Sequence, residues 1–333
     1  MRRLILSISI AVILIAAVTF AWFVYLELKI PIIHEEATLV IQRGTPLVMI
    51  GEQLKRAGVI KRPILFTGYA RFARLDRKVK AGEYTFENGL TTLDVLKKLA
   101  KGECRLYKVT FIEGWTMNQM ADYIAAQPFA GPNMRESFLT AANDKYLLKT
   151  FGVEADSAEG YLFPDTYLIE RPKTAEWVIK MLVDQFHKVY TVELQNRAHE
   201  LGMTTNEVIT IASIIEKETG REDERGLISS VFHNRLKKNM PLQADPTVIY
   251  GLKDFDGNLR KADLSNPHPY NTYVHPGLPP APIANPGLAS IRAALWPADS
   301  EYIYFVARGD GSHEFTKTLA EHQKAVVKYQ LKR

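Results

Sequence analysis

The first feature of the hydrophobic pattern is an uncharged run of 23 residues, Leu4 to Leu26, preceded by Arg2 and Arg3 and followed by Glu27. At 1.5 Å per residue this helix would be about 34 Å long, enough to cross a hydrocarbon core of roughly 30 Å. A cleavable signal peptide is the alternative, but its apolar region is shorter and ends in small residues, whereas this run ends in aromatic ones. The pattern predicts an anchor over residues 4–26, a cytoplasmic stub at 1–3 and the rest of the chain outside.

The next segment, residues 37–102, has the pattern of a small α/β module. Thr38–Gln42 and Gly82–Phe86 read as strands. A helical spacing of apolar residues follows each strand, over Val48–Ala57 and Thr91–Ala100. Such a module binds or orients a ligand, or it serves as a plain spacer, and the pattern leaves both interpretations open.

Residues 105–333 mix helical and strand patterns and predict a second, larger domain. Long helical patterns cover Ala175–Leu201, Thr205–Thr219 and Arg225–Lys237. The stretch Pro241–Pro297 is rich in Pro, Gly, Asn and Tyr, which indicates loops packed over a site. The fold class expected is therefore α+β, with a single membrane helix, a small α/β module and a mixed α/β domain. Shorter elements are expected at Leu106–Ile112 (strand), at Asn118–Ala126 (helix), and around Arg308–Gly311 (two strands before a C-terminal helix).

Composition and charge exclude several classes of ligand and catalytic site. The net charge of +5, from 42 basic and 37 acidic residues, is too weak a bias to indicate nucleic-acid binding. The lone Cys104 has no partner for a disulfide or a cysteine-based metal site. The eight histidines include no pair at i, i+4, and the sequence has no phosphate-binding glycine loop, GxSxG or HExxH motif. No metal or cofactor is expected, and catalysis by carboxylate side chains remains as the candidate chemistry.

The pattern over Thr205–Thr219 places a carboxylate among apolar residues. Thr204 and Glu207 have the spacing of a capping box, which predicts that a helix begins there. Because successive residues advance by about 100°, Glu218 falls within the apolar stripe of this helix and Glu216 falls at its edge. The stripe consists of Val208, Ile211, Ala212, Ile214 and Ile215, and the polar face consists of Thr210, Ser213 and Lys217.

A carboxylate on an apolar stripe is costly unless it is paired or protonated, because desolvation raises its pKa. A raised pKa suits a general acid that works near neutral pH. A solvated helix terminus is the alternative explanation for the run Glu216-Lys217-Glu218. The periodicity favours Glu218 as the candidate acid and keeps Glu216 as the second choice.

Several ordered motifs resemble the endolytic murein transglycosylase family (MltG, or YceG-like). The resemblance extends over nearly the whole chain, including the anchor and the small module. One departure is Ala281, which stands after two prolines where the family has glycine. The motifs that carry the resemblance are Ala212–Thr219 (ASIIEKET), Glu159–Tyr167 (EGYLFPDTY), Leu242–Gly251 (LQADPTVIYG), Tyr270–Tyr273 (YNTY), Gly277–Pro280 (GLPP) and Ile283–Gly287 (IANPG).

The resemblance implies a single-pass inner-membrane protein with a LysM-like module and a catalytic domain that faces the cell wall. Such enzymes cut the β-1,4 bond from N-acetylmuramic acid to N-acetylglucosamine inside glycan strands and leave a 1,6-anhydro end. The family's catalytic glutamate falls on Glu218, which would first protonate the glycosidic oxygen and then deprotonate the muramyl C6 hydroxyl. The expected substrate-binding residues, which the same motifs supply, are Gln243, Asp245, Asn271, Tyr273 and Tyr161.

For each of these five residues a structural role stays open, since Asp245 before Pro246 also fits a helix cap and buried tyrosines often only pack. The family also implies partners among the glycan synthases of the penicillin-binding class, although no surface of the sequence identifies one. Two alternatives to a lytic transglycosylase remain. One is a non-catalytic scaffold that binds peptidoglycan near a synthase, and the other is a hydrolytic muramidase.

Overall fold

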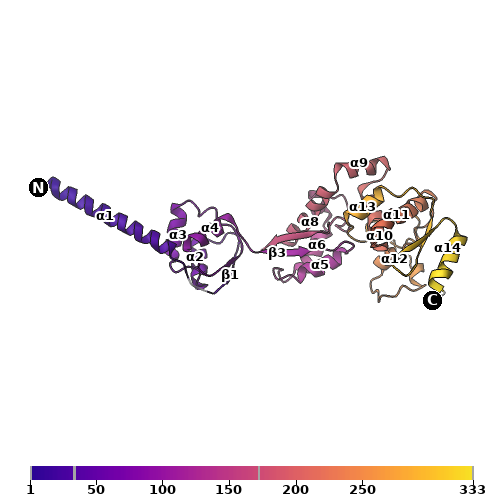
Figure 1. Ribbon diagram of the computed structural model, residues 1–333, viewed down its shortest axis with the longest axis horizontal. Coiled ribbons are helices and arrows are strands. Elements are labelled where there is room, and N and C mark those ends of the chain that lie inside the picture. Colours follow the sequence, from indigo (N-terminus) through magenta and orange to yellow (C-terminus); the bar gives the residue numbers. More distant parts are fainter. Residues whose placement is uncertain (1, 33–34, 172, 332–333) are drawn as a thin grey trace. The chain divides into compact units, whose positions relative to one another are not determined.

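The computed structural model describes residues 2–32, 35–171 and 173–331 and divides the chain into two compact units (Figure 1). The first unit comprises Met1–Val109 and Tyr167–Lys173, and the second comprises Thr110–Thr166 and Thr174–Arg333. The mixture of helices and short strands, with an apolar helix at the N-terminus, confirms the mixed helix and strand content expected from the sequence. No sequence pattern indicated that a short later segment, Tyr167–Lys173, would join the first unit.

The first unit begins with helix α1 (Arg2–Lys29), whose residues Ser7–Lys29 are long and apolar enough to cross a membrane. Exposed apolar side chains cover this helix, among them Ile13 and Phe20, each about two-thirds exposed. Such exposure in water is unfavourable, and it fits a helix that is surrounded by lipid.

A small α/β module follows α1. Its two strands are antiparallel, with Ala37 opposite Phe86 and Ile41 opposite Gly82. The predicted strand Gly82–Phe86 is confirmed, and the predicted helices are shifted by one residue. An additional helix, α3, separates the strands, and the sequence pattern did not indicate it. The elements are β1 (Ala37–Ile41), α2 (Leu47–Arg56), α3 (Pro63–Phe72), β2 (Gly82–Phe86) and α4 (Thr92–Lys101).

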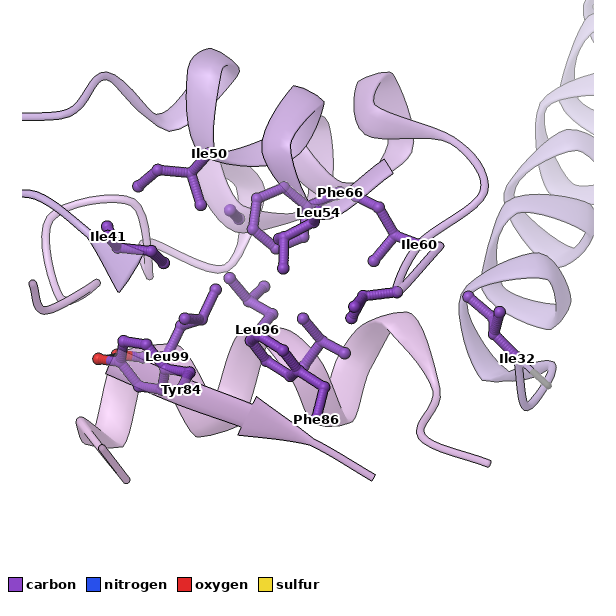
Figure 2. Packing of buried hydrophobic residues seen from close by; sticks show 13 residues of the cluster. Ile32, Ile41, Ile50, Leu54, Ile60, Phe66, Tyr84, Phe86, Leu96 and Leu99 are labelled. Carbon is purple, nitrogen blue, oxygen red and sulfur yellow. Dashed lines mark hydrogen bonds between the residues drawn. The ribbon is translucent and has the colours of Figure 1, made fainter. Parts of the chain in front are cut away.

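The module has a hydrophobic core of its own. Tyr84 and Phe86 project from β2 toward the apolar faces of the helices, and neither ring is exposed to solvent (Figure 2). Helix α4 starts with a capping box between Thr91 and Asp94, and Gly102 ends it with a left-handed backbone at φ 75°. The core also includes Ile41, Ile50, Leu54, Ile60, Phe66, Val95, Leu96 and Leu99.

A two-stranded sheet of β3 (Leu106–Thr110) and β4 (Thr166–Glu170) lies where the chain passes from one unit to the other. The second unit is mainly helical, with a C-terminal hairpin. Its helices are α5 (Met117–Ala125), α6 (Met134–Ala142), α7 (Lys145–Thr150), α8 (Ala175–Val189), α9 (Val192–Glu200), α10 (Thr205–Glu218), α11 (Glu222–Lys237), α12 (Asp245–Gly251), α13 (Leu288–Leu295) and α14 (Leu319–Val326). A 3₁₀ turn (Asp263–Ser265), strands β5 (Tyr304–Ala307) and β6 (His313–Thr316), and a π-helical turn (Val327–Leu331) complete it.

The prediction of one long helix over Ala175–Leu201 is wrong, because α8 and α9 are separate. Tyr190 leaves the helical conformation at ψ 72°, and Thr191 is extended at ψ 167° as the N-cap of α9. The Tyr190 ring stacks on Phe186 at 5.3 Å and is buried. Burial of this ring is a tertiary effect, which the helical periodicity of the sequence does not record.

Candidate active site

Helix α10 forms the centre of the second unit and packs against α13, α11 and α12 (Figure 1). The predicted capping box is present: the Thr204 hydroxyl accepts from the Glu207 N–H, and the Glu207 carboxylate accepts from the Thr204 N–H at 2.8 Å. The prediction of a polar face holds for Lys217, which is exposed, and is wrong for Thr210 and Ser213, which are buried. The Ser213 hydroxyl donates to the Thr210 carbonyl, and this hydrogen bond offsets the cost of burying it.

Glu218, the last residue of α10, is surrounded by protein yet keeps some accessible surface. Burial raises the pKa of its carboxyl to about 8; the nearby negative charge of Asp245 adds to the rise and the positive charge of Arg235 opposes it. Within the described ranges Glu218 forms no hydrogen bond or ion pair. Its carboxyl is therefore protonated at neutral pH and free to donate a proton to a bound molecule.

Glu216, the second choice from the sequence, is engaged in the structure. Its carboxylate accepts a hydrogen bond of 3.0 Å from the backbone N–H of Gly287, the N-cap residue of α13. Glu113 lies against the same glycine. Burial, and then the charge of Glu216, raise the pKa of Glu113. Glu216 thus places a carboxylate at the N-terminus of α13, which favours a role in positioning that helix.

The loop before α12 carries Gln243 and Asp245 and is held in a strained conformation. Gln243 has φ 51°, a left-handed value that is rare for a residue with a side chain. The Arg235 guanidinium donates to the carbonyl oxygens of Leu242, at 2.6 Å, and Ile303, at 2.7 Å. This cation therefore holds the loop near the Glu218 carboxyl.

Two buried hydroxyls fix the same loop from the other side. Thr272 accepts from the Ala244 N–H at 3.0 Å, and Thr247 donates to the Ala244 carbonyl at 2.7 Å. Tyr273, next to Thr272, donates its phenol to the Asp245 carboxylate at 2.6 Å. The structure thus brings Asp245 and Tyr273 together near Glu218. Gln243 lies on the same loop, and Gln243 and Asp245 are exposed.

The other two predicted substrate contacts lie differently. The Asn271 amide is buried and donates to backbone carbonyls of Asp263, Leu264 and Asn266, so it organises a loop. Tyr161 is buried against Phe186, with ring centroids 5.1 Å apart. The Tyr161 hydroxyl donates to the Asn206 amide oxygen, and the Asn271 amide oxygen accepts from the Tyr273 N–H, so the polar groups of both side chains are engaged within the protein.

A second buried carboxyl, Glu159, joins distant parts of this unit. It accepts from the Met117 N–H at 2.9 Å, from the Asn285 amide at 2.9 Å and from the Tyr250 phenol at 3.2 Å. Burial raises its pKa to about 7, and these hydrogen bonds oppose the rise. Asn285 also accepts from the N–H groups of Gly160 and Leu162. The sequence motifs contained Glu159 and Asn285, but periodicity gave no sign that they form one network.

A groove of about 1840 Å³ opens beside this network. Tyr250 and Tyr270 line it, with ring centroids 4.9 Å apart, and aromatic faces of this kind suit the apolar faces of sugar rings. Lys217 and Pro246, the neighbours of Glu218 and Asp245 in the sequence, also line the groove. Glu218 and Asp245 themselves are not part of the lining, and only these sequence neighbours of theirs reach the groove.

Comparisons with a family model, with curated proteins and with solved structures all find relatives of one family. The model of the YceG-like family matches residues 39–328. The endolytic murein transglycosylase of Bacillus subtilis (strain 168) is 33% identical over 305 residues, which cover 87% of this chain and 83% of that protein. The endolytic murein transglycosylase of Streptococcus pneumoniae (strain R6) is 31% identical over 88% of this chain, which spans only 58% of that protein. The crystal structure of a putative YceG-like protein from Listeria monocytogenes superimposes with a TM-score of 0.60 at 33% identity, covering 87% of this chain and 98% of that one.

Proposed function

Because the chain belongs to the YceG-like family, we infer that it is a lytic transglycosylase that cuts the glycan strands of peptidoglycan. The bond proposed is the β-1,4 link from N-acetylmuramic acid to N-acetylglucosamine within a strand, and the product is a 1,6-anhydro-muramyl end. The state of the Glu218 carboxyl carries this proposal. The carboxyl is partly accessible and forms no hydrogen bond within the described chain, and its pKa is raised to about 8.

One glutamate suffices for this reaction because the substrate supplies the nucleophile. Glu218, protonated at neutral pH, donates its proton to the glycosidic oxygen as the bond to C1 breaks. The resulting carboxylate then takes the proton from the muramyl C6 hydroxyl, whose oxygen bonds to C1. Atoms balance without water, and the tethered hydroxyl gains the high effective concentration of an intramolecular reaction.

Asp245 suits a supporting role in this step. Positive charge develops at C1 in the transition state of glycoside cleavage, and a nearby carboxylate stabilises that charge. The Tyr273 phenol fixes the orientation of Asp245 through the 2.6 Å hydrogen bond. Gln243, exposed on the strained loop, is placed to hydrogen-bond a hydroxyl or acetamido group of the strand.

The remaining parts of the proposal concern location and organisation. We propose that residues 4–26 anchor the protein in the inner membrane, with residues 1–3 in the cytoplasm and residues 105–333 forming the catalytic domain on the cell-wall side. The module at residues 37–102 is proposed to be LysM-like, and its two helices between antiparallel strands, with a separate core, support an independent binding module. Glycan synthases of the penicillin-binding class are the proposed partners.

The test uses the full chain in detergent, incubated with purified glycan strands, with mass spectrometry of the fragments. Wild type is expected to give internal fragments that end in 1,6-anhydro-muramic acid, and Glu218→Gln is expected to give none. Glu216→Gln is the matched control, since it removes a carboxylate two residues away and should retain cleavage of the same kind.

Each other result contradicts a stated part of the proposal. Reducing ends in place of anhydro ends would make the protein a hydrolytic muramidase. Anhydro products from Glu218→Gln, together with their loss in Glu216→Gln, would move the acid to Glu216. Strand binding without cleavage by wild type would favour the scaffold.

A further inference from the structure

The positive charge of the chain is concentrated in one short segment of the first unit. Residues 61–80 contain seven basic residues and one acidic residue, Asp76, a net charge of +6. The whole chain has a net charge of +5, so the other 313 residues together carry −1 (5 − 6). Such local asymmetry is typical of a surface that meets an anionic partner. The seven basic residues are Lys61, Arg62, Arg71, Arg74, Arg77, Lys78 and Lys80.

Most of these cations are available for a partner. All seven are exposed. Arg62 pairs with Glu27, and the Lys80 ammonium donates to the Lys101 carbonyl. The other five form no ion pair with any residue in the part of the chain that the structure describes. Five unneutralised cations in this short segment repel one another, and an anionic surface would relieve that repulsion.

The helix that runs through this segment, α3, has one buried face and one exposed apolar face. Phe66 and Ala70 are completely buried in the module core. On the opposite side, Ile64 is 80% exposed and Phe72 is 85% exposed, with Gly68 between them. At 100° per residue these three positions lie within 80° of one another, so they share one face. Exposed apolar side chains beside cations are typical of a helix that lies at a membrane surface.

Helix α3 begins at the end of the proposed membrane span. The Arg62 side chain, at its N-cap, lies 3.2 Å from the Glu27 carboxylate and 5.9 Å from the centroid of the Phe23 ring. Phe23 belongs to the aromatic end of the apolar run, where such rings lie at the level of lipid headgroups. The start of α3 is therefore at the height of the membrane–water interface.

We propose that α3 and the basic segment after it bind anionic phospholipid headgroups of the leaflet in which α1 ends. This α3 surface consists of Lys61, Ile64, Arg71, Phe72, Arg74, Arg77 and Lys78. Its apolar side chains enter the headgroup region and its cations pair with phosphates. The inference rests on the proposal that α1 spans the membrane and is independent of the reaction in the second unit. Binding of the α3 surface to lipid would restrict the orientation of the module at the membrane.

The test places a spin label on the proposed contact face of the full chain in nanodiscs. Gly68→Cys in a Cys104→Ser background provides the site, because a Cβ at Gly68 meets no atom within 4 Å. Gly131→Cys is the matched control, another exposed glycine with open space, outside the first unit. Discs of phosphatidylcholine alone are compared with discs that also contain phosphatidylglycerol, and accessibility to a water-soluble nickel reagent is measured.

We expect phosphatidylglycerol to lower the accessibility of the label at residue 68 at least about fivefold. This factor corresponds to the attraction of a single cation to an anionic membrane surface. The label at residue 131 should not respond to lipid charge. The triple variant Arg71→Glu, Arg74→Glu, Arg77→Glu should restore accessibility, since none of these cations supports the fold through an ion pair.

Four results would overturn the inference. Equal accessibility in both discs would show that the surface does not select anionic lipid. Protection that the triple variant leaves unchanged would remove the cations from the explanation. Protection that appears only when glycan strands are added to phosphatidylcholine discs would assign the surface to a wall polymer. Protein that does not stay with the discs would refute the anchor and this inference together, while leaving the catalytic proposal intact.

Discussion

The substitution Glu218→Gln should make the protein more stable, and increasingly so as the pH rises. The carboxyl forms no hydrogen bond that glutamine would lose within the described chain, and the two side chains have nearly the same shape. A carboxyl whose pKa is higher in the folded chain holds its proton more tightly there. The stability it contributes is complete below its ordinary pKa of 4.5 and is lost as the pH rises through about 8. Glutamine does not titrate and avoids this loss.

The pKa values set the size of the effect. A rise from 4.5 to about 8 corresponds, at about 1.4 kcal/mol per unit, to at most about 5 kcal/mol over the whole window. Because Glu218 keeps some contact with solvent, screening reduces this limit, and we expect roughly 2–3 kcal/mol. With a urea slope of about 1–3 kcal/mol per molar, the variant's unfolding midpoint should rise by about 1 M relative to wild type.

The assay is urea unfolding of both proteins in detergent at pH 5, 7 and 9, followed by tryptophan fluorescence. Trp115, Trp177 and Trp296 report on the second unit. Glu159, whose pKa is raised to about 7, titrates in the same window in both proteins and cancels in their difference. Glu216→Gln is the control and should be destabilised at every pH, because the Gly287 N–H loses a charged acceptor.

A constant stability difference between wild type and Glu218→Gln from pH 5 to pH 9 would refute this reasoning. It would mean that Glu218 titrates in the folded chain as it does in the unfolded one. The carboxyl would then be ionised at neutral pH and unsuited to act as a general acid, and the proposed mechanism would lose its main support.

Three further predictions concern the site and its frame. The rate of cleavage should decline as the pH rises through about 8, since Glu218 must be protonated. In a pH–rate profile, Asp245→Asn should move that decline to lower pH, because the negative charge of Asp245 raises the pKa of Glu218. An unmoved profile would contradict the proximity of Asp245 to Glu218. Gly160→Ala should cost about 2 kcal/mol or more in urea unfolding, because φ is 89° and the new Cβ would lie 2.5 Å from a proline ring, whereas Gly131→Ala, with open space, should cost far less. Asn285→Ala should cost about 3 kcal/mol or more by the same measurement, because it leaves the buried N–H groups of Gly160 and Leu162 unpaired and removes one donor to the Glu159 carboxyl. A loss below about 1 kcal/mol would show that water replaces the amide.

Local features of the fold were predictable from the sequence. The strand Gly82–Phe86 and the capping box of Thr204 and Glu207 lie where the pattern placed them. These signals arise from residues within a few positions of each other, which a short window of sequence contains in full. Helix α3 was missed because its spacing is less regular and its exposed face carries Ile64 and Phe72, large apolar residues that obscure amphipathicity.

Part of the candidate site was also predictable. Glu218 was distinguished by its place on the apolar stripe, and Asp245 and Tyr273 by the family's motifs. Their grouping depended on the fold, since the hydrogen bond from Tyr273 to Asp245 spans 28 positions in the chain. Asn271 illustrates the opposite case, because a polar residue in a family motif can serve a buried loop as well as a ligand.

By itself, the sequence determined the apolar span, many helix and strand positions, the family and the candidate for the acid. Only the tertiary structure decided that Glu216 caps α13 and that Glu159 and Asn285 meet across 126 positions. It also decided that Thr210 and Ser213 are buried. The physical reason is that periodicity describes one face of one helix, whereas burial and charge–charge distances depend on which other elements cover that helix. Those elements come from remote parts of the chain, and the pKa that suits Glu218 to its chemistry exists only after they have packed around it.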